Sequence, residues 1–300
     1  LELTLTSIFQ DNSDVPITDY EVILSDNDPL HEIELLVNKF DFENLKVLDV
    51  CYGIGYNTKN PLIYIGKARA DLWLYIKGVA APKVQYFTEK FKKGSLTKII
   101  DDIRGSQNDK ALLFYSNGML NKNRVLAYDD FNSFMYNLSY WSSSSNGFCI
   151  WKDEFDKIGE IKLNPLFPHT SLFLTQHCLG KYIINDEYLF DVQRIPKRGG
   201  HNKFKAIEYP SLIDAVYKSG YISMKCKKHI LNDILFYFLP TLLFNKYVAR
   251  IECFDIYGYK QNIKRYFPWF SYYLTYMLIL IVPFNKLYNR IKKRLKKLFF

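Results

Sequence analysis

Residues 46–58 read "KVLDVCYGIGYNT", an apolar segment that ends at Asp49 and leads into a turn containing Gly53 and Gly55. Leucine and valine followed by a glycine turn are typical of a buried strand, which we expect over residues 45–51. Residues 59–70 have the composition of a helix with Pro61 in its first turn, and residues 71–77, "DLWLYIK", predict another strand. The order strand, turn, helix, strand is the starting point for the fold class.

The residues before this stretch continue the same alternation. Residues 20–26, "YEVILSD", predict a strand, and residues 29–40 place apolar side chains at helical spacing. Residues 2–10 also read as a helix, residues 110–160 mix strands with Ser/Asn-rich loops, and residues 166–245 are more helical. Alternating strands and helices predict an α/β fold whose mostly parallel sheet is covered on both faces.

Composition and charge exclude two classes of protein. Hydrophobic residues make up 48% of the chain, which is too many for a disordered protein. The net charge is +9, but seven of these charges belong to the last fifteen residues. We therefore expect no nucleic-acid partner, because such a protein would be basic throughout. Five scattered cysteines without a CxxC pair predict a reduced cytosolic protein without a zinc site.

The C-terminal part, residues 246–300, predicts an aromatic and basic membrane-associating region. Residues 266–285 are uncharged, and in the following residues Leu287, Ile291, Leu295 and Leu298 recur at helical spacing between cations. Such a pattern favours a segment that lies in a membrane interface over one that crosses the bilayer. We expect residues 266–300 to hold the protein peripherally on the cytoplasmic face of the plasma membrane. The alternative is a core helix followed by a solvated charged face.

Two ligand-binding families resemble the front of the chain. "VLDVCYGIGYNT" resembles the S-adenosylmethionine loop of methyltransferases, although Cys51 replaces the first glycine and the next strand ends at Lys77 instead of an acid. A longer resemblance, to family-2 glycosyltransferases of the bacterial surface-polysaccharide type, is carried by four segments in order. These are "YEVILSDNDP" (20–29), "ENLKVLDVCYGIGYNTKNPLIYIGKARADLWLYIKG" (43–78), "FNSFMYNLSYWSSSSNGFCIWKDEF" (131–155) and "FPHTSLFLTQHCLGKYIINDEYLFDVQR" (167–194).

This second resemblance implies a fold and a domain plan. It implies a GT-A-like, Rossmann-type mixed sheet flanked by helices, within a glycosyltransferase domain of residues 1–245. The nucleotide-binding part would take about residues 1–105 and the acceptor part about residues 106–245. The family's first strand is missing, so we expect further residues upstream of Leu1.

The resemblance also implies which residues bind the donor. Asp26 and Asn27 match the nucleoside-binding turn, and Tyr56 and Asn57 match a loop that lines the cleft. Lys77 and Gly78 fall where the diphosphate would lie. The alternatives are an Asx turn at Asp26 that caps the next helix, and an ordinary turn at Tyr56 and Asn57.

Residues 78–81 read "GVAA" where the family carries the carboxylates of a divalent metal site. None of these side chains can bind Mg²⁺ or Mn²⁺, so we expect the metal site to be lost and name no cofactor. Cations would then stabilise the leaving diphosphate, and the candidates are Lys67, Arg69, Lys77 and Lys83.

His169 is the candidate base that takes the proton of the acceptor hydroxyl, because imidazole titrates near neutral pH. Its structural alternative is a histidine at a helix start that bonds to backbone. His177, Asp153, Glu154 and Asp156 are further candidates.

These residues predict transfer of a sugar from a nucleotide-sugar donor, a UDP-sugar, to a surface-polysaccharide or lipid-linked acceptor. A catalytically inactive glycosyltransferase-like binding subunit and an S-adenosylmethionine-dependent methyltransferase are the alternatives.

Overall fold

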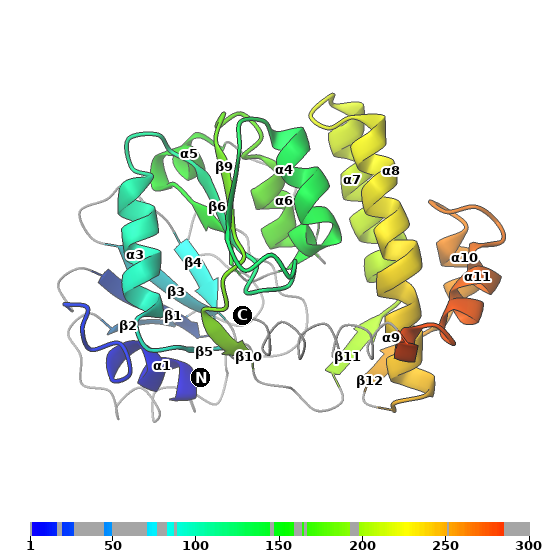
Figure 1. The fold of residues 1–300 in the computed structure, drawn as a ribbon, viewed down its shortest axis with the longest axis horizontal. Helices are drawn as coiled ribbons and strands as arrows, with labels where there is room; N and C mark the ends of the chain where they lie inside the picture. Colours follow the sequence, from blue (N-terminus) through cyan, green and yellow to red (C-terminus); the bar gives the residue numbers. More distant parts are fainter. Residues whose placement is uncertain are drawn as a thin grey trace, which may run out of the picture. The chain divides into compact units, whose positions relative to one another are not determined.

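A computed structural model describes residues 2–16, 20–26, 45–49, 71–76, 83–86, 89–144, 147–158, 164, 167–192, 198–250 and 252–284. Strands and helices mix along the described residues, which confirms the α/β class (Figure 1). The chain forms two compact units, unit 1 of Leu1–Gln193 and unit 2 of Arg194–Phe300. The boundary that the sequence suggested after residue 245 falls within helix α9 (Leu239–Tyr247).

The main sheet of unit 1 has five strands in the order β2-β1-β3-β4-β8. The strands are β1 (Tyr20–Asp26), β2 (Leu45–Asp49), β3 (Asp71–Ile76), β4 (Lys83–Tyr86) and β8 (Cys149–Ile150). The first three confirm the strands predicted at 20–26, 45–51 and 71–77.

The prediction of a mostly parallel sheet is wrong for these strands. Only β1 and β2 pair in parallel, whereas β3 pairs antiparallel to β1, β4 to β3 and β8 to β4. The connection from β3 to β4, residues 77–82, is shorter than a parallel crossover requires. The apolar pattern of a strand indicates that it is buried. Whether the strand runs parallel or antiparallel to its neighbours depends on the strands with which its backbone pairs.

Two smaller sheets complete unit 1. In one, β9 (Tyr182–Asn185) lies between β6 (Leu112–Tyr115), to which it is parallel, and β7 (Val125–Tyr128), to which it is antiparallel. In the other, β5 (Glu89–Phe91) pairs antiparallel with β10 (Phe190–Val192). A single bridge between Phe114 and Phe148 brings β6 next to β8 of the main sheet.

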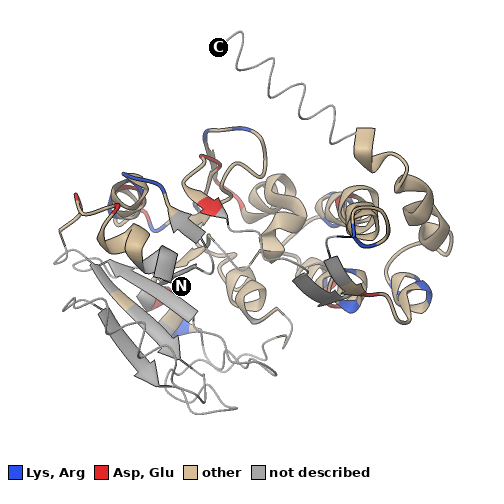
Figure 2. Ribbon diagram, turned by 90° about the horizontal axis from the view of Figure 1, so that it is seen from below, with Lys and Arg blue, Asp and Glu red and all other residues tan. Residues whose placement is uncertain are grey.

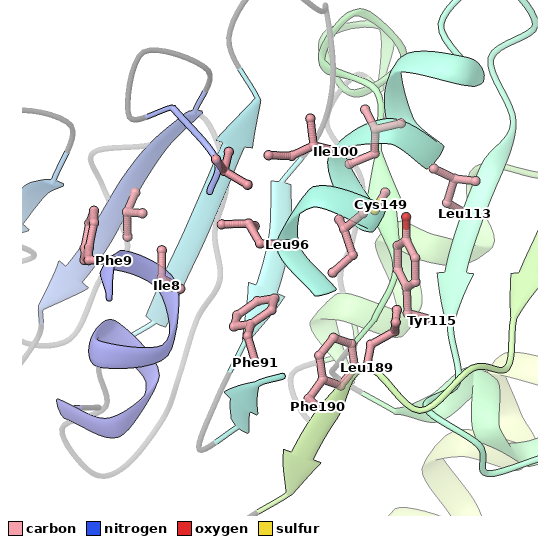
Figure 3. Close-up of a cluster of buried hydrophobic side chains, with 14 of the residues drawn as sticks. Ile8, Phe9, Phe91, Leu96, Ile100, Leu113, Tyr115, Cys149, Leu189 and Phe190 are labelled. Carbon is pink, nitrogen blue, oxygen red and sulfur yellow. The ribbon is translucent and has the colours of Figure 1, made fainter. Parts of the chain in front are cut away.

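Among the described residues of unit 1 there are six helical segments: α1 (Glu2–Phe9), α3 (Ser95–Gly105), α4 (Phe131–Leu138), the 3-10 helix η2 (Ser139–Ser143), α5 (Lys152–Lys157) and α6 (Pro168–Leu174). The helix α1 confirms the helix predicted at 2–10. The helix α3 buries Leu96, Ile99, Ile100 and Ile103, one apolar face at helical spacing. These side chains meet α1, β5, β6 and β10 in one core cluster (Figure 3).

A second, aromatic cluster packs α4 and α6 against β9. The ring of Phe134 lies 5.8 Å from that of Phe173 and 5.4 Å from that of Tyr182, measured between centroids. Phe131 and Phe114 also contact Phe173, at 6.4 and 5.9 Å. Aromatic pairs at these separations add to the free energy gained by burial. Part of the high aromatic content of the chain therefore lies in the hydrophobic core.

Unit 2 is mostly helical. Its parallel strands are β11 (Arg198–His201) and β12 (Glu252–Asp255), and its α-helices are α7 (Tyr209–Lys218), α8 (Met224–Asp233), α9, α10 (Tyr259–Ile263) and α11 (Ser271–Leu278). Two π-helical turns, η3 (Phe204–Glu208) and η4 (Ile234–Phe238), lead directly into α7 and α9. Each of those helices has a proline, Pro210 or Pro240, in its first turn, and proline lacks the N–H that an α-helix would use there.

A buried asparagine joins the start of unit 2 to the segment that runs from β12 to α10. The Asn202 side chain donates to the backbone oxygens of Asp255 (3.1 Å) and Tyr257 (2.8 Å) and accepts from the Asn262 amide (2.7 Å). Asn202 is fully buried, so these bonds replace the water that its amide gives up. They fix the chain after β11 against the start of α10.

Helix α11 lies inside the region predicted to associate with membranes. Among the described residues, the helices are too short or too polar for any of them to cross a bilayer.

Candidate functional site

The carboxyl ends of β1 and β2 form the candidate site. In the parallel pair, Asp26 at the end of β1 lies directly opposite Asp49 at the end of β2. The connection between the two strands, residues 27–44, is long enough for the crossover that parallel strands need. The structure thus brings together two acidic residues that lie 23 positions apart in the sequence.

Two neighbouring acidic residues at the carboxyl ends of strands can bind a ligand that carries several hydroxyl groups. Ionised carboxylates only accept hydrogen bonds, and ribose hydroxyls donate them. The same charges would repel a diphosphate, so the phosphates of a nucleotide would have to lie away from this pair. The role predicted for Asp26 stays a prediction, and Asp49 joins it as a second candidate.

Most of the other predicted donor-binding residues lie outside the described residues: Asn27, Tyr56, Asn57, Lys77 and Gly78. So do Lys67 and Arg69, whereas Lys83 begins β4 and its backbone pairs with Ile150.

The last residue described before Lys77 and Gly78 is Ile76, at the end of β3. Ile76, the last residue of β3, pairs with Tyr20 at the start of β1, six positions before Asp26. Because β3 is antiparallel to β1, its last residue lies at the end of the sheet opposite the acidic pair. The arrangement of the strands does not support the prediction that Gly78 and Asp26 belong to one donor-binding site.

His169 is the second residue of α6 and is buried, with 7% of its surface exposed. Its Nε2 lies 3.2 Å from the backbone oxygen of Ser143, and its ring packs against Phe167 at 6.0 Å. These contacts match the structural alternative, a histidine at a helix start that bonds to backbone. The role of His169 as the base that takes the acceptor proton stays a prediction.

Three of the four remaining base candidates also make structural contacts. Nδ1 of His177 lies 3.2 Å from the backbone oxygen of Leu174. Asp153 forms an ion pair with Lys110, which is the main cause of the lowered pKa of its carboxyl group. Glu154 pairs with Lys157 at 2.7 Å within α5. The side chain of Asp156 is outside the described part of the chain.

Asp186 is a buried polar residue that the sequence analysis missed. Its carboxylate accepts hydrogen bonds from the Ser116 hydroxyl (2.5 Å) and from the backbone N–H groups of Leu120 (3.0 Å), Lys122 (2.6 Å) and Asn123 (3.2 Å). Asp186 thereby holds the whole loop between β6 and β7. The signal was the "SNG" turn at 116–118 together with "ND" at 185–186, both common in turns that bind backbone through side chains.

A second missed group links α3 to β9. The Asn185 amide donates to Asp102 at 2.9 Å, and Lys98 pairs with Glu187 at 3.1 Å. Burial raises the pKa of Asp102, while the Asn185 amide and Lys98 oppose that rise. These contacts join α3 to the end of β9 and the turn after it.

Unit 2 contains a buried lysine, Lys205, in η3. Burial lowers the pKa of its ammonium group to about 7. The Lys205 Nζ lies 4.5 Å from the ring centroid of Tyr209 and 5.0 Å from that of Phe238. Ring faces favour the ammonium form and so oppose the effect of burial.

In the part of the chain that the structure describes, no three His, Cys, Asp or Glu side chains are grouped so that they could hold a metal ion. The loss of a metal site at residues 78–81 remains a prediction from the sequence.

Comparison with protein-family models, with curated proteins and with solved structures gives no match to this chain. A functional assignment therefore depends on the residues quoted above and on the geometry of the sheet.

Proposed function

We propose that the chain is a glycosyltransferase-type protein that binds a nucleotide sugar at the carboxyl ends of β1 and β2. The observation that supports this proposal is the register that sets Asp26 opposite Asp49 at the end of a parallel strand pair. Ligands of open α/β sheets bind outside the carboxyl ends of parallel strands. The two carboxylates would accept hydrogen bonds from the ribose of the donor.

The reaction would transfer the sugar of a UDP-sugar to a surface-polysaccharide or lipid-linked acceptor. The acceptor hydroxyl attacks the anomeric carbon, the bond from that carbon to the diphosphate oxygen breaks, and the hydroxyl proton passes to a base. The diphosphate leaves with a negative charge that a cation has to stabilise. Lys77 directly follows the last residue of β3, and Lys83 begins β4, at the end of the sheet opposite Asp26 and Asp49, so a cation elsewhere in the chain would have to take this role. We expect this transfer without a divalent metal, because residues 78–81 hold no carboxylate.

A second candidate is a glycosyltransferase-like subunit that binds the donor without turning it over. The contacts of His169 with Ser143 and of Asp153 with Lys110 favour it, since these two of the five predicted bases are engaged in structural contacts. This alternative keeps the nucleoside site at Asp26 and Asp49 and abandons the transfer step.

Calorimetric titration of the full chain with UDP, other nucleoside diphosphates and S-adenosylmethionine, each with and without Mn²⁺, tests the ligand class. We expect a nucleoside diphosphate to bind. Asp26→Asn and Asp49→Asn should each weaken that binding roughly 10-fold or more, which is the size expected for one lost hydrogen bond to a charged group. Asp109→Asn is the matched control, because it removes the same charge from an exposed position in unit 1.

The outcomes separate the candidates. Preferential binding of S-adenosylmethionine would replace the proposal by the methyltransferase, and equal affinity of the Asp26 and Asp109 variants would exclude the proposed site. Release of UDP from a UDP-sugar identifies an enzyme, while binding without release identifies the binding subunit. A turnover that depends strongly on Mn²⁺ would contradict the expected loss of the metal site.

A further inference from the structure

Helix α11 and the residues around it expose a row of large apolar side chains. We name this row the apolar stripe: Trp269, Phe270, Tyr273, Met277, Leu280, Ile281 and Phe284. Trp269 is 71% exposed and Leu280 is 74% exposed. Contiguous exposed apolar surface of this kind marks a site of interaction with another molecule or with a membrane.

The buried side of α11 carries small polar side chains. Ser271 and Thr275 are fully buried, and the Thr275 hydroxyl accepts a hydrogen bond from the Tyr259 hydroxyl at 3.0 Å. Thr275 in turn donates to the backbone oxygen of Tyr272 at 2.8 Å. A helix on the surface of a globular protein usually buries its apolar face and exposes its polar face. The reversed arrangement of α11 fits a helix whose outer face meets an apolar phase.

The stripe carries no charge and follows a helical spacing. Phe270, Tyr273, Met277, Ile281 and Phe284 recur at intervals of three or four residues, which is the spacing of one helix face, and Trp269 and Leu280 each adjoin one of them in the sequence. Residues 266–284 contain no Asp, Glu, Lys or Arg, and their ribbon is tan throughout in Figure 2.

Cations flank the stripe on both sides in the sequence. Lys260, Lys264 and Arg265 precede it and are exposed, and the Lys260 Nζ lies 5.5 Å from the ring centroid of Tyr273. Seven Lys and Arg residues and no acid follow within residues 286–300. Apolar side chains bordered by cations are suited to the surface of a bilayer, where acyl chains and anionic headgroups lie close together.

We propose that the apolar stripe docks on an anionic lipid bilayer and lies in the plane of its interface. The eight residues of α11 span roughly 12 Å, well short of the ~30 Å hydrocarbon core, so the helix itself is too short to cross. Lipid phosphates would bind the flanking cations while Trp269, Leu280 and Phe284 enter the headgroup and acyl boundary. This surface belongs to unit 2 and does not depend on the donor proposed for unit 1.

Sedimentation of the full chain with vesicles tests the proposal in the absence of any nucleotide. We expect binding to vesicles of phosphatidylcholine with about one third phosphatidylserine, and weaker binding to phosphatidylcholine alone or at high salt. Trp269→Ser together with Leu280→Ser should reduce the binding roughly tenfold or more, because two inserting side chains are lost. The matched control is Tyr221→Ser together with Met224→Ser, two exposed apolar residues outside the stripe.

Thermal unfolding of both double variants checks that their fold is intact. Binding by the control variant at the level of the unmodified chain, together with loss by the stripe variant, supports the proposal. The proposal fails if the unmodified chain ignores anionic vesicles, or if both variants bind equally. It also fails if light scattering shows a dimer that the stripe variant converts to a monomer, since the stripe would then be covered by a second copy.

Discussion

The buried Lys205 allows the effect of burying a charged group on the unfolding free energy to be measured directly. Only 8% of its surface is exposed, and burial lowers its pKa from 10.5 to about 7. In the unfolded chain the ammonium is solvated and keeps its ordinary pKa. Burial therefore penalises the charged form, and Lys205→Met removes the titrating group while keeping an unbranched apolar chain of similar length.

The sign of the effect follows from proton binding. Between the folded pKa of about 7 and the unfolded value of 10.5, the unfolded chain binds more protons than the folded chain. Stability then rises with pH across this window, and the penalty is complete below the folded pKa. Lys205 alone would add roughly 3 kcal/mol of stability between pH 6 and pH 9. The rings of Tyr209 and Phe238 favour the ammonium, so we expect about 2 kcal/mol.

Urea unfolding of the full chain at pH 6, 7, 8 and 9, followed by circular dichroism, measures this change. The unfolding free energy of Lys205→Met minus that of the unmodified chain should fall by about 2 kcal/mol from pH 6 to pH 9. Lys228→Met, an exposed lysine on α8, is the matched control and should follow the unmodified chain at every pH. A difference between Lys205→Met and the unmodified chain that stays constant from pH 6 to pH 9 would refute the reasoning.

Three further results are expected in unit 1. Asp186→Ala leaves the buried Ser116 hydroxyl and the N–H groups of Leu120, Lys122 and Asn123 without their acceptor and should lower the unfolding free energy by about 2–3 kcal/mol, measured in urea. Gly147→Ala should lower the melting temperature, because a Cβ there would lie 2.2 Å from the backbone oxygen of Tyr115 at φ +91°; an unchanged melting temperature would contradict this geometry. Cys178 is exposed and should react rapidly with a thiol reagent in the folded chain, so Cys178→Ser should remove one fast-reacting thiol. Cys149→Ser should remove none, since Cys149 is buried and burial raises its pKa.

Local patterns predicted three strands and one helix of unit 1 well. Residues 20–26, 45–49 and 71–76 are strands, and residues 2–9 form a helix, within one or two residues of the predicted bounds. Each of these segments carries its own signal, because β-branched and apolar residues between turns favour extended chain wherever they occur. The position of Asp26 at a strand end was predictable for the same reason.

The pairing partners of those strands were not predictable from the pattern. Whether β3 runs with β1 or against it depends on hydrogen bonds to a distant segment, and the same apolar alternation satisfies both directions. The position of Asp49 opposite Asp26 is likewise a product of register. The contacts of His169 with Ser143 and of Asp186 with the loop before β7 depend on segments 26 or more residues away.

The amino-acid order therefore determined which segments form strands and helices, where charge is concentrated and which residues lie at strand ends. Packing decided the direction of β3, the meeting of Asp26 with Asp49, the burial of His169 and the outward side of α11. The physical reason is that propensity and periodicity act over one or two turns of chain, while register, burial and hydrogen-bond partners are set by segments that meet only after the chain has folded.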